Sequence, residues 1–213
     1  MKIYAVADIH GQTNRFDLIE NNISKLRPDV LVVAGDITSY TNSVSVISRL
    51  NDMSVPVLAV RGNTDLRKVE SLLEQFPNIS SIHLRKTKIK NVPFVGVSGT
   101  IPVPFSSRIC FREKKVVTRL ESLVKRSTVL VAHPPPRGVL DEAFGRFHAG
   151  CRSLFEVILR CQPKLFICGH IHERPGAEYI GTTLVVNCSI GRTGGGAIME
   201  YDGDKNPTVK MLP

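Results

Sequence analysis

Five short apolar segments of the chain are each followed closely by residues that bind metal ions in proteins. The segments are 2–7, 29–34, 56–60, 128–132 and 164–168, and their composition predicts buried strands. The side chains that follow them are, in chain order, Asp8 with His10, Asp36, Asn63, His133, and His170 with His172. Because ligands bind outside the carboxyl ends of the strands in open α/β sheets, we expect these side chains to meet at one edge.

The donor atoms of this set indicate which metals it suits. Carboxylate, amide and imidazole donors favour Mn, Fe, Zn or Ni, since the set contains no thiolate to select a softer metal. Seven candidate ligands are too many for one ion. They suit two ions about 3.5–4 Å apart that share a carboxylate, an arrangement used to hydrolyse phosphate esters.

The spacing within the set supports a common site. Asp8 and His10 are two positions apart, as are His170 and His172, so each pair can present both side chains on one side of an extended segment. A glycine also precedes three members of the set, at Gly35, Gly62 and Gly169. We expect these glycines to permit backbone dihedrals or close approaches that a Cβ atom would forbid.

The composition predicts one soluble domain, 1–213. The chain has 213 residues, of which 42% are hydrophobic, and contains no run of 18 uncharged apolar residues that could span a membrane. The N-terminus lacks the basic start, long apolar centre and cleavage site of a signal peptide, so we expect a cytoplasmic protein. The five cysteines are odd in number and form no CxxC or CxC, which argues against a disulfide framework or a zinc ribbon.

The formal net charge of +9 favours anionic partners, such as nucleic acids and phosphorylated metabolites. The densest basic stretches are RKTKIK (85–90) and REKK (112–115). Since we find no interleaved aromatic residues, we interpret them as a solvated hairpin and a helix start. Nucleic-acid binding through these patches is therefore not the favoured reading.

The hydrophobic periodicity predicts an α/β fold in which strands and helices alternate. The predicted helices are 15–26, 41–50, 65–76, 111–126 and 151–161. The first three follow strands in βα units, which implies neighbouring parallel strands. The segments 79–84, 86–90 and 92–97 have the pattern of short hairpin strands, and 98–108 and 133–150 are predicted to be long irregular loops. From residue 178 onward we expect three or four antiparallel strands.

Five motifs resemble the signature of calcineurin-like metallophosphoesterases over about residues 1–200. They are DIHG (8–11), GD (35–36), GNTD (62–65), AHPPP (132–136) and GHIH (169–172). The stretches SGTIPVPF, HPPPRGVLD, FHAG, and CGHIHERPG followed by TLVVN are similar to the small prokaryotic Icc-like branch. The resemblance implies a four-layer α-β-β-α sandwich with mixed sheets and a metal centre at the strand ends.

The resemblance also implies roles for the candidate ligands. It assigns Asp36 to bridge two divalent ions, with Mn²⁺ expected first and Fe, Zn, Ni or Mg as alternatives. The other ligands would be Asp8, His10 and His172 for one ion, and Asn63, His133 and His170 for the second. A hydroxide shared by the two ions would attack the phosphorus of a phosphoester, and Asn63 would help to stabilise the phosphoryl charge.

The chain departs from the family pattern at Thr64. Many members carry a histidine there, which is held to protonate the leaving oxygen or to stabilise the transition state. A threonine hydroxyl does not titrate near neutral pH and cannot replace an imidazolium as an acid. His148, in the second long loop, is a candidate substitute; the alternative is a histidine that packs this loop or caps a helix.

Three further residues lie within or beside the motifs. Arg61 and Arg137 are neighbours of candidate ligands and are candidates to clamp a phosphate. We expect Asp65 to orient neighbouring groups, with His10 as one candidate.

The function predicted from these features is a dinuclear metal-dependent phosphodiesterase. A phosphomonoesterase acting on a nucleotide or phosphoprotein is the first alternative. A binding scaffold that has lost catalysis is the second; Thr64 favours it, but the presence of all seven candidate ligands argues against it. A DNA-repair nuclease would fit the basic charge but not the short chain.

Overall fold

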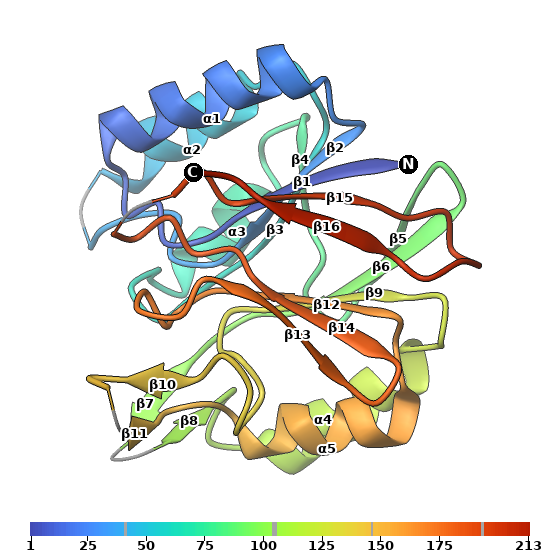
Figure 1. Cartoon of the computed structure of the whole chain (residues 1–213). Helices are drawn as coiled ribbons and strands as arrows, with labels where there is room; N and C mark the ends of the chain where they lie inside the picture. Colours follow the sequence, from blue (N-terminus) through green and yellow to red (C-terminus); the bar gives the residue numbers. More distant parts are fainter. Residues whose placement is uncertain (41, 104–105, 146, 193) are drawn as a thin grey trace.

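Two six-stranded mixed sheets pack face to face in the computed structural model of the chain, which describes residues 1–40, 42–103, 106–145, 147–192 and 194–213 (Figure 1). Helices α1 to α3 cover the outer face of the first sheet, and α4 and α5 cover the outer face of the second. The layers are therefore α-β-β-α, which confirms the predicted fold class.

The first sheet has the order β16-β15-β1-β2-β3-β4. Its four parallel strands are β1 (Lys2–Val6), β2 (Val30–Ala34), β3 (Val57–Val60) and β4 (Ile79–Ser81). The helices between them are α1 (Thr13–Leu26), α2 (Ser43–Asn51) and α3 (Lys68–Leu73). This confirms the three predicted βα units. The antiparallel hairpin of β15 (Ala197–Glu200) and β16 (Thr208–Met211) extends the sheet beside β1.

The second sheet has the order β13-β14-β12-β9-β6-β5. Its parallel strands are β6 (Val92–Val97), β9 (Val129–Ala132), β12 (Leu165–Cys168) and β14 (Thr183–Asn187). The antiparallel strands β5 (Lys86–Ile89) and β13 (Gly176–Ile180) form its edges. Helices α4 (Glu113–Leu123) and α5 (Arg152–Cys161) precede β9 and β12.

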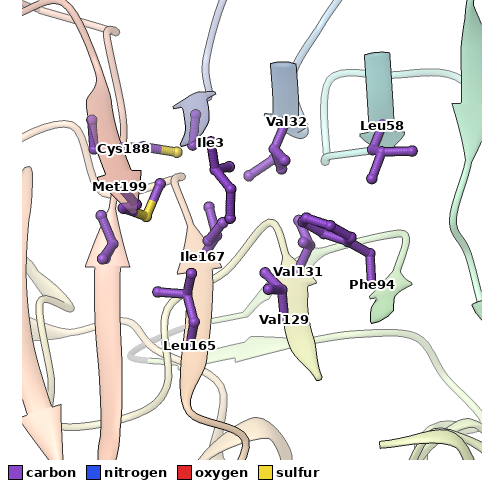
Figure 2. Close-up of a cluster of buried hydrophobic side chains, with 14 of the residues drawn as sticks. Ile3, Val32, Leu58, Phe94, Val129, Val131, Leu165, Ile167, Cys188 and Met199 are labelled. Carbon is purple, nitrogen blue, oxygen red and sulfur yellow. The ribbon is translucent and has the colours of Figure 1, made fainter. Parts of the chain in front are cut away.

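The core between the sheets explains the continuous apolar runs. Along β1, Ile3 and Ala5 face the second sheet, whereas Tyr4 and Val6 face the helices. Both faces of a central strand are thus buried, so its residues are apolar without alternation. Figure 2 shows the meeting of the two sheets, where side chains such as Val32 pack toward residues of the opposite sheet. Because both faces of these strands are packed, the strand ends that carry the candidate ligands are held in place.

The C-terminal strands and the two long loops differ from the prediction. The C-terminal strands form two hairpins in different sheets, and β14 is parallel to β12, so a purely antiparallel arrangement was wrong. All five residues of β14 are buried, because this strand lies inside the sheet, between β13 and β12. Each long loop contains a short hairpin: β7 (Ile101–Val103) with β8 (Ser106–Arg108), and β10 (Glu142–Ala143) with β11 (Phe147–His148).

Some predicted positions lie outside the described residues: 41 at the start of the second helix, and 104–105 and 146 in the loops. Within the described ranges, no helix combines the length and apolar composition needed to cross a membrane.

Candidate metal centre

The carboxyl ends of β1, β2, β3, β9 and β12 bring all seven predicted ligand side chains into one cluster. Two groups have donor atoms within 4.8 Å of one another: Asp8 with His10 and His172, and Asp8 with Asp36 and His133. Asn63 joins the second group, with its Oδ1 2.9 Å from His133 Nε2. The ring of His170 lies beside that of His133, with 5.0 Å between centroids. We call these seven residues the metal-centre cluster.

Asp8 lies at the bottom of the cluster and has an unsatisfied oxygen. Its side chain is fully buried, and its Oδ2 accepts a hydrogen bond from the backbone N–H of His170 at 3.1 Å. Its Oδ1 has no hydrogen-bond partner among the described residues, and it lies 3.2 Å from His172 Nε2 and 3.9 Å from His133 Nε2. A buried carboxylate oxygen without a partner is costly. A divalent cation among these donors would satisfy it, so the residues fit the metal that the motifs imply.

Asp36 faces both groups. Its Oδ1 accepts a hydrogen bond from the backbone N–H of Thr64 at 2.9 Å, which fixes the carboxylate plane. Its Oδ2 lies 3.4 Å from His133 Nε2 and 3.8 Å from His10 Nε2. One oxygen between imidazoles of two groups is the position that a bridging carboxylate requires.

His133 is held in one orientation by the backbone. Its Nδ1 donates to the carbonyl oxygen of Ala34 at 2.8 Å, so its Nε2 points into the cluster. Burial by itself disfavours the charged ring, but the carboxylates of Asp36 and Asp8 outweigh burial and raise the pKa of His133 to about 9. Burial and the neighbouring His133 charge lower the pKa of His170 to about 4. In the metal-free protein, His133 thus holds a proton that a metal ion would replace.

The raised pKa of His133 predicts a pH dependence of stability. Its folded-state pKa of about 9 exceeds the ordinary value of 6.5, so its ion pairs stabilise the fold fully below pH 6.5 and progressively less up to pH 9. The Asp8 carboxylate, 3.2 Å from His172 Nε2, raises the pKa of His172 and acts in the same direction. We expect the Tm of the metal-free protein in chelator to fall from pH 6.5 to 9, as calorimetry would measure. A Tm that rises across this window would contradict this electrostatic account.

Thr64 and Asp65 shape the loops around Asp36. The Thr64 hydroxyl donates to the carbonyl of Thr38 at 3.0 Å and lies 3.4 Å from His10 Nδ1, which turns His10 Nε2 toward Asp36. The buried Asp65 carboxylate accepts hydrogen bonds from the backbone N–H groups of Ile37, Thr38 and Gly62. Asp65 therefore joins the loops that carry Asp36 and Asn63. The predicted contact between Asp65 and His10 was wrong, and Thr64 takes that place.

Arg15 is a positioning residue that the sequence analysis missed. This residue of α1 donates from Nη1 to the carbonyl of Asp8 at 2.6 Å and from Nη2 to the carbonyl of Gly191. Gly191 packs so closely against His172 that a Cβ atom there would lie 2.6 Å from the ring. Asp8 itself has a positive φ of 65°, a strained conformation for a non-glycine residue. Arg15 thus connects two segments, distant in sequence, that hold Asp8 and His172.

We expect Arg15→Ala to weaken Mn²⁺ binding by about 10- to 100-fold, the range for groups that orient metal ligands. Isothermal titration would measure this loss directly, and Arg15→Lys should restore only part of it because a lysine cannot bridge both carbonyls in the same geometry. Arg152→Ala, which removes an exposed arginine of α5, is the matched control. Unchanged affinity in Arg15→Ala would refute the positioning role.

The three remaining predicted residues contact the loops around the cluster. Arg61 donates from Nη1 to the carbonyls of Gly62 and Asp65, contacts that support the loop. His148 Nδ1 lies 2.7 Å from Asp141 Oδ1, and the side chain is 51% exposed. Arg137 donates to the carbonyl of His148 at 3.4 Å. A phosphate-clamping role for Arg61 and Arg137 stays a prediction.

Ser107 connects the second long loop, 133–150, to the metal-centre cluster, and no sequence motif identified this residue. This buried residue of β8 has its Oγ 3.3 Å from His170 Nε2, and its backbone N–H donates to the carbonyl of Gly150 at 3.3 Å. Gly150 follows His148 by two positions, so β8 joins the Asp141–His148 pair to the rim of the metal-centre cluster. Ser107 itself lies in the first of the two loops that were predicted to be irregular.

Comparison with known proteins agrees with the candidate metal centre described above. The family model described as calcineurin-like phosphoesterase matches residues 1–174. MJ1162, an uncharacterized protein of Methanocaldococcus jannaschii, is 31% identical over 220 residues, which cover 98% of this chain and 95% of that protein.

Two solved structures share the fold at low sequence identity. A dimetal phosphatase from Danio rerio has a TM-score of 0.69 at 15% identity and covers 100% of this chain and 96% of its own. A structure described as a novel archaeal phosphodiesterase has a TM-score of 0.59 at 16% identity and covers 100% of both chains. With the family match over most of the chain, these findings confirm the predicted family. The chain belongs to the calcineurin-like phosphoesterase family.

Proposed function

We propose that the protein is a dinuclear metal-dependent phosphodiesterase that acts in the cytoplasm. Family membership implies a phosphoester hydrolase with a dinuclear metal centre. The observation that carries the proposal is the position of Asp36 Oδ2, 3.4 Å from His133 Nε2 and 3.8 Å from His10 Nε2, together with the Oδ1 of Asp8 that lacks a hydrogen-bond partner. This arrangement offers one carboxylate to two ions at once.

The proposed ligand sets start from the two groups of donors and add to the second Asn63 and His170, which lie beside His133. Asp8, His10 and His172 would hold one ion, and Asp36 would reach both. Asn63, His133 and His170 would hold the second ion. Oxygen and imidazole donors without thiolate are compatible with Mn²⁺, which we propose as the native metal.

The chain's own residues would orient the substrate around these ions. When bound, the two ions supply a nucleophile at neutral pH and neutralise phosphoryl charge. Asn63 directs its Oδ1 toward His133, which leaves its amide N–H groups as donors to a phosphoryl oxygen. Thr64 keeps the His10 ring in place but brings no titrating group to the leaving oxygen.

We propose His148 as the group that protonates the leaving oxygen. The buried Asp141 accepts hydrogen bonds at Oδ2 from the backbone N–H groups of Gly138 and Gly150, and its Oδ1 contacts His148 Nδ1. A carboxylate fixed in this way orients the imidazole and leaves Nε2 available, as an acid requires. The half-exposed position of His148 gives a substrate access to Nε2.

Replacement of His148 by Ala should therefore act selectively on poor leaving groups. We expect kcat/KM for diphenyl phosphate to fall by about 10²- to 10⁴-fold, the usual contribution of general acid catalysis. The value for bis-p-nitrophenyl phosphate should change little, because p-nitrophenolate leaves without a proton. Asp141→Asn should reproduce this selectivity in weaker form. An equal loss with both substrates would instead indicate that His148 only packs the loop.

The diester preference is tested by substrate comparison. The protein is stripped of metal, supplied with Mn²⁺, Ni²⁺, Zn²⁺ or Mg²⁺, and assayed with bis-p-nitrophenyl phosphate and p-nitrophenyl phosphate. Metal-dependent cleavage of the diester in preference to the monoester is the expected result. A monoester preference would favour the phosphatase alternative, and no turnover with any of the metals would favour a binding scaffold.

A further inference from the structure

A shallow groove of about 800 Å³ lies along the outer surface of α4, at the bottom of the molecule in Figure 1. Five of its lining side chains are cationic and one is aromatic. We call these six residues the basic groove: Arg108, Phe111, Arg112, Lys114, Lys115 and Arg119.

The positive charge of the basic groove is largely uncompensated. Arg108 forms an ion pair with Glu113, at 3.5 Å. In the part of the chain that the structure describes, the other four cations have no carboxylate within ion-pair distance, and the nearby Glu121 and Glu156 pair with Arg160. Like charges gathered without partners repel one another, and a polyanion would relieve this repulsion.

Phe111 adds an exposed aromatic surface to the basic groove. Its side chain is 78% exposed, just before α4, and it is bordered in sequence by the REKK stretch. Our interpretation of REKK as a patch without an aromatic neighbour overlooked this residue. An aromatic ring on which a base can stack, surrounded by cations that contact the phosphates, is the combination found in sites for single-stranded nucleic acid.

The basic groove and the metal-centre cluster both include contacts of strand β8. Ser107, whose Oγ lies 3.3 Å from His170 Nε2, immediately precedes Arg108. The groove and the metal-centre cluster are thus connected through β8, the strand that carries both residues. A second copy of this chain is disfavoured on this face, because two copies would bring their unpaired cations together.

From these observations we infer that the basic groove binds single-stranded nucleic acid and directs one of its phosphodiesters to the metal centre. This inference rests on the proposed function and names the substrate class. Hydrolysis would consume one water molecule and break one P–O ester bond, leaving a phosphate monoester on one fragment and a hydroxyl group on the other.

The test separates binding from cleavage. Fluorescence anisotropy with a labelled oligothymidylate, in chelator, measures binding without hydrolysis. We expect Phe111→Ala to raise Kd by about 5- to 100-fold, the effect of losing one stacked base. Arg112→Ala with Lys115→Ala should also raise Kd and should lower the salt slope by about 1.4, which is about 0.7 for each lost phosphate contact.

Lys86→Ala with Lys88→Ala is the matched control, because it removes two exposed charges from β5 and should leave binding nearly unchanged. The control pair should also retain wild-type turnover of bis-p-nitrophenyl phosphate. A loss of binding in the control pair equal to that in the groove variants would refute a specific groove. Binding of phosphatidylserine vesicles without binding of the oligonucleotide would also overturn the inference, in favour of a membrane surface.

The failures of the two proposals are distinguishable. If the protein cleaves bis-p-nitrophenyl phosphate but does not bind the oligonucleotide, the groove inference is wrong and the proposed function stands. If it binds the oligonucleotide through the groove but hydrolyses neither ester with any metal, the proposed function is wrong, and with it the assignment of nucleic acid as substrate.

Discussion

Asp36→Asn should lower kcat/KM for bis-p-nitrophenyl phosphate by more than about 10³-fold, beyond the range for removing one electrostatic group from an active site. The asparagine keeps the size of the side chain and can still accept the hydrogen bond from Thr64. It removes the negative charge that faces both His133 and His10. A carboxylate shared by two ions contributes to the binding of each, so the loss should affect both.

Mn²⁺ titration of Asp36→Asn should show weaker binding and fewer than two ions per chain. Asp52→Asn, which neutralises an exposed carboxylate after α2, is the control and should retain activity. Thermal unfolding in chelator verifies that the variant is folded. Full activity in folded Asp36→Asn would rule out a bridging role for this carboxylate.

Gly62→Ala should damage both the fold and the metal centre. A Cβ atom at position 62 would lie 2.1 Å from Asp36 Oδ1 and 2.4 Å from the Asp36 backbone nitrogen. A backbone atom cannot move aside as a flexible side chain can, so the loops that carry Asp36 and Asn63 must separate. We expect destabilisation of about 1–3 kcal/mol, typical of overpacking. Displacement of catalytic groups by about 1 Å should lower kcat/KM by about 10²-fold.

Gly176→Ala is the matched control for this substitution. At Gly176 a Cβ atom would meet only the Leu140 side chain, at an ordinary distance of 3.5 Å. Chemical denaturation and steady-state kinetics of the two variants measure the difference. If Gly62→Ala behaves like Gly176→Ala, the close packing against Asp36 has no functional importance.

The elements that carry the candidate ligands could be predicted because they are buried on both faces. Continuous apolar runs such as Val30–Ala34 are typical of central strands, and a polar residue directly after such a run lies at the edge of the sheet. The partners of β14 could not be predicted in the same way. Its run has the same composition whether its neighbours are parallel or antiparallel, and the pairing with β12 depends on contacts distant in sequence.

The residues that support the ligands were harder to predict. Arg15 occupies the first turn of a helix, where an arginine is usually solvated, and its contact with Gly191 spans most of the chain. Ser107 lies in a Pro- and Gly-bearing loop without periodicity, and its approach to His170 depends on the β8 backbone contact with Gly150. Asp65 was recognised as an orienting group, but its partners are backbone N–H groups, which sequence motifs do not identify.

The most direct test of a dinuclear centre is the number and coupling of bound ions. Metal-free protein is titrated with Mn²⁺ and followed by calorimetry and electron paramagnetic resonance. Two ions about 3.5–4 Å apart with a shared carboxylate should give a stoichiometry of two and a spin-coupled spectrum, which disappears in Asp36→Asn. A single uncoupled ion per chain, or no binding, would contradict the dinuclear centre on which the proposed function depends.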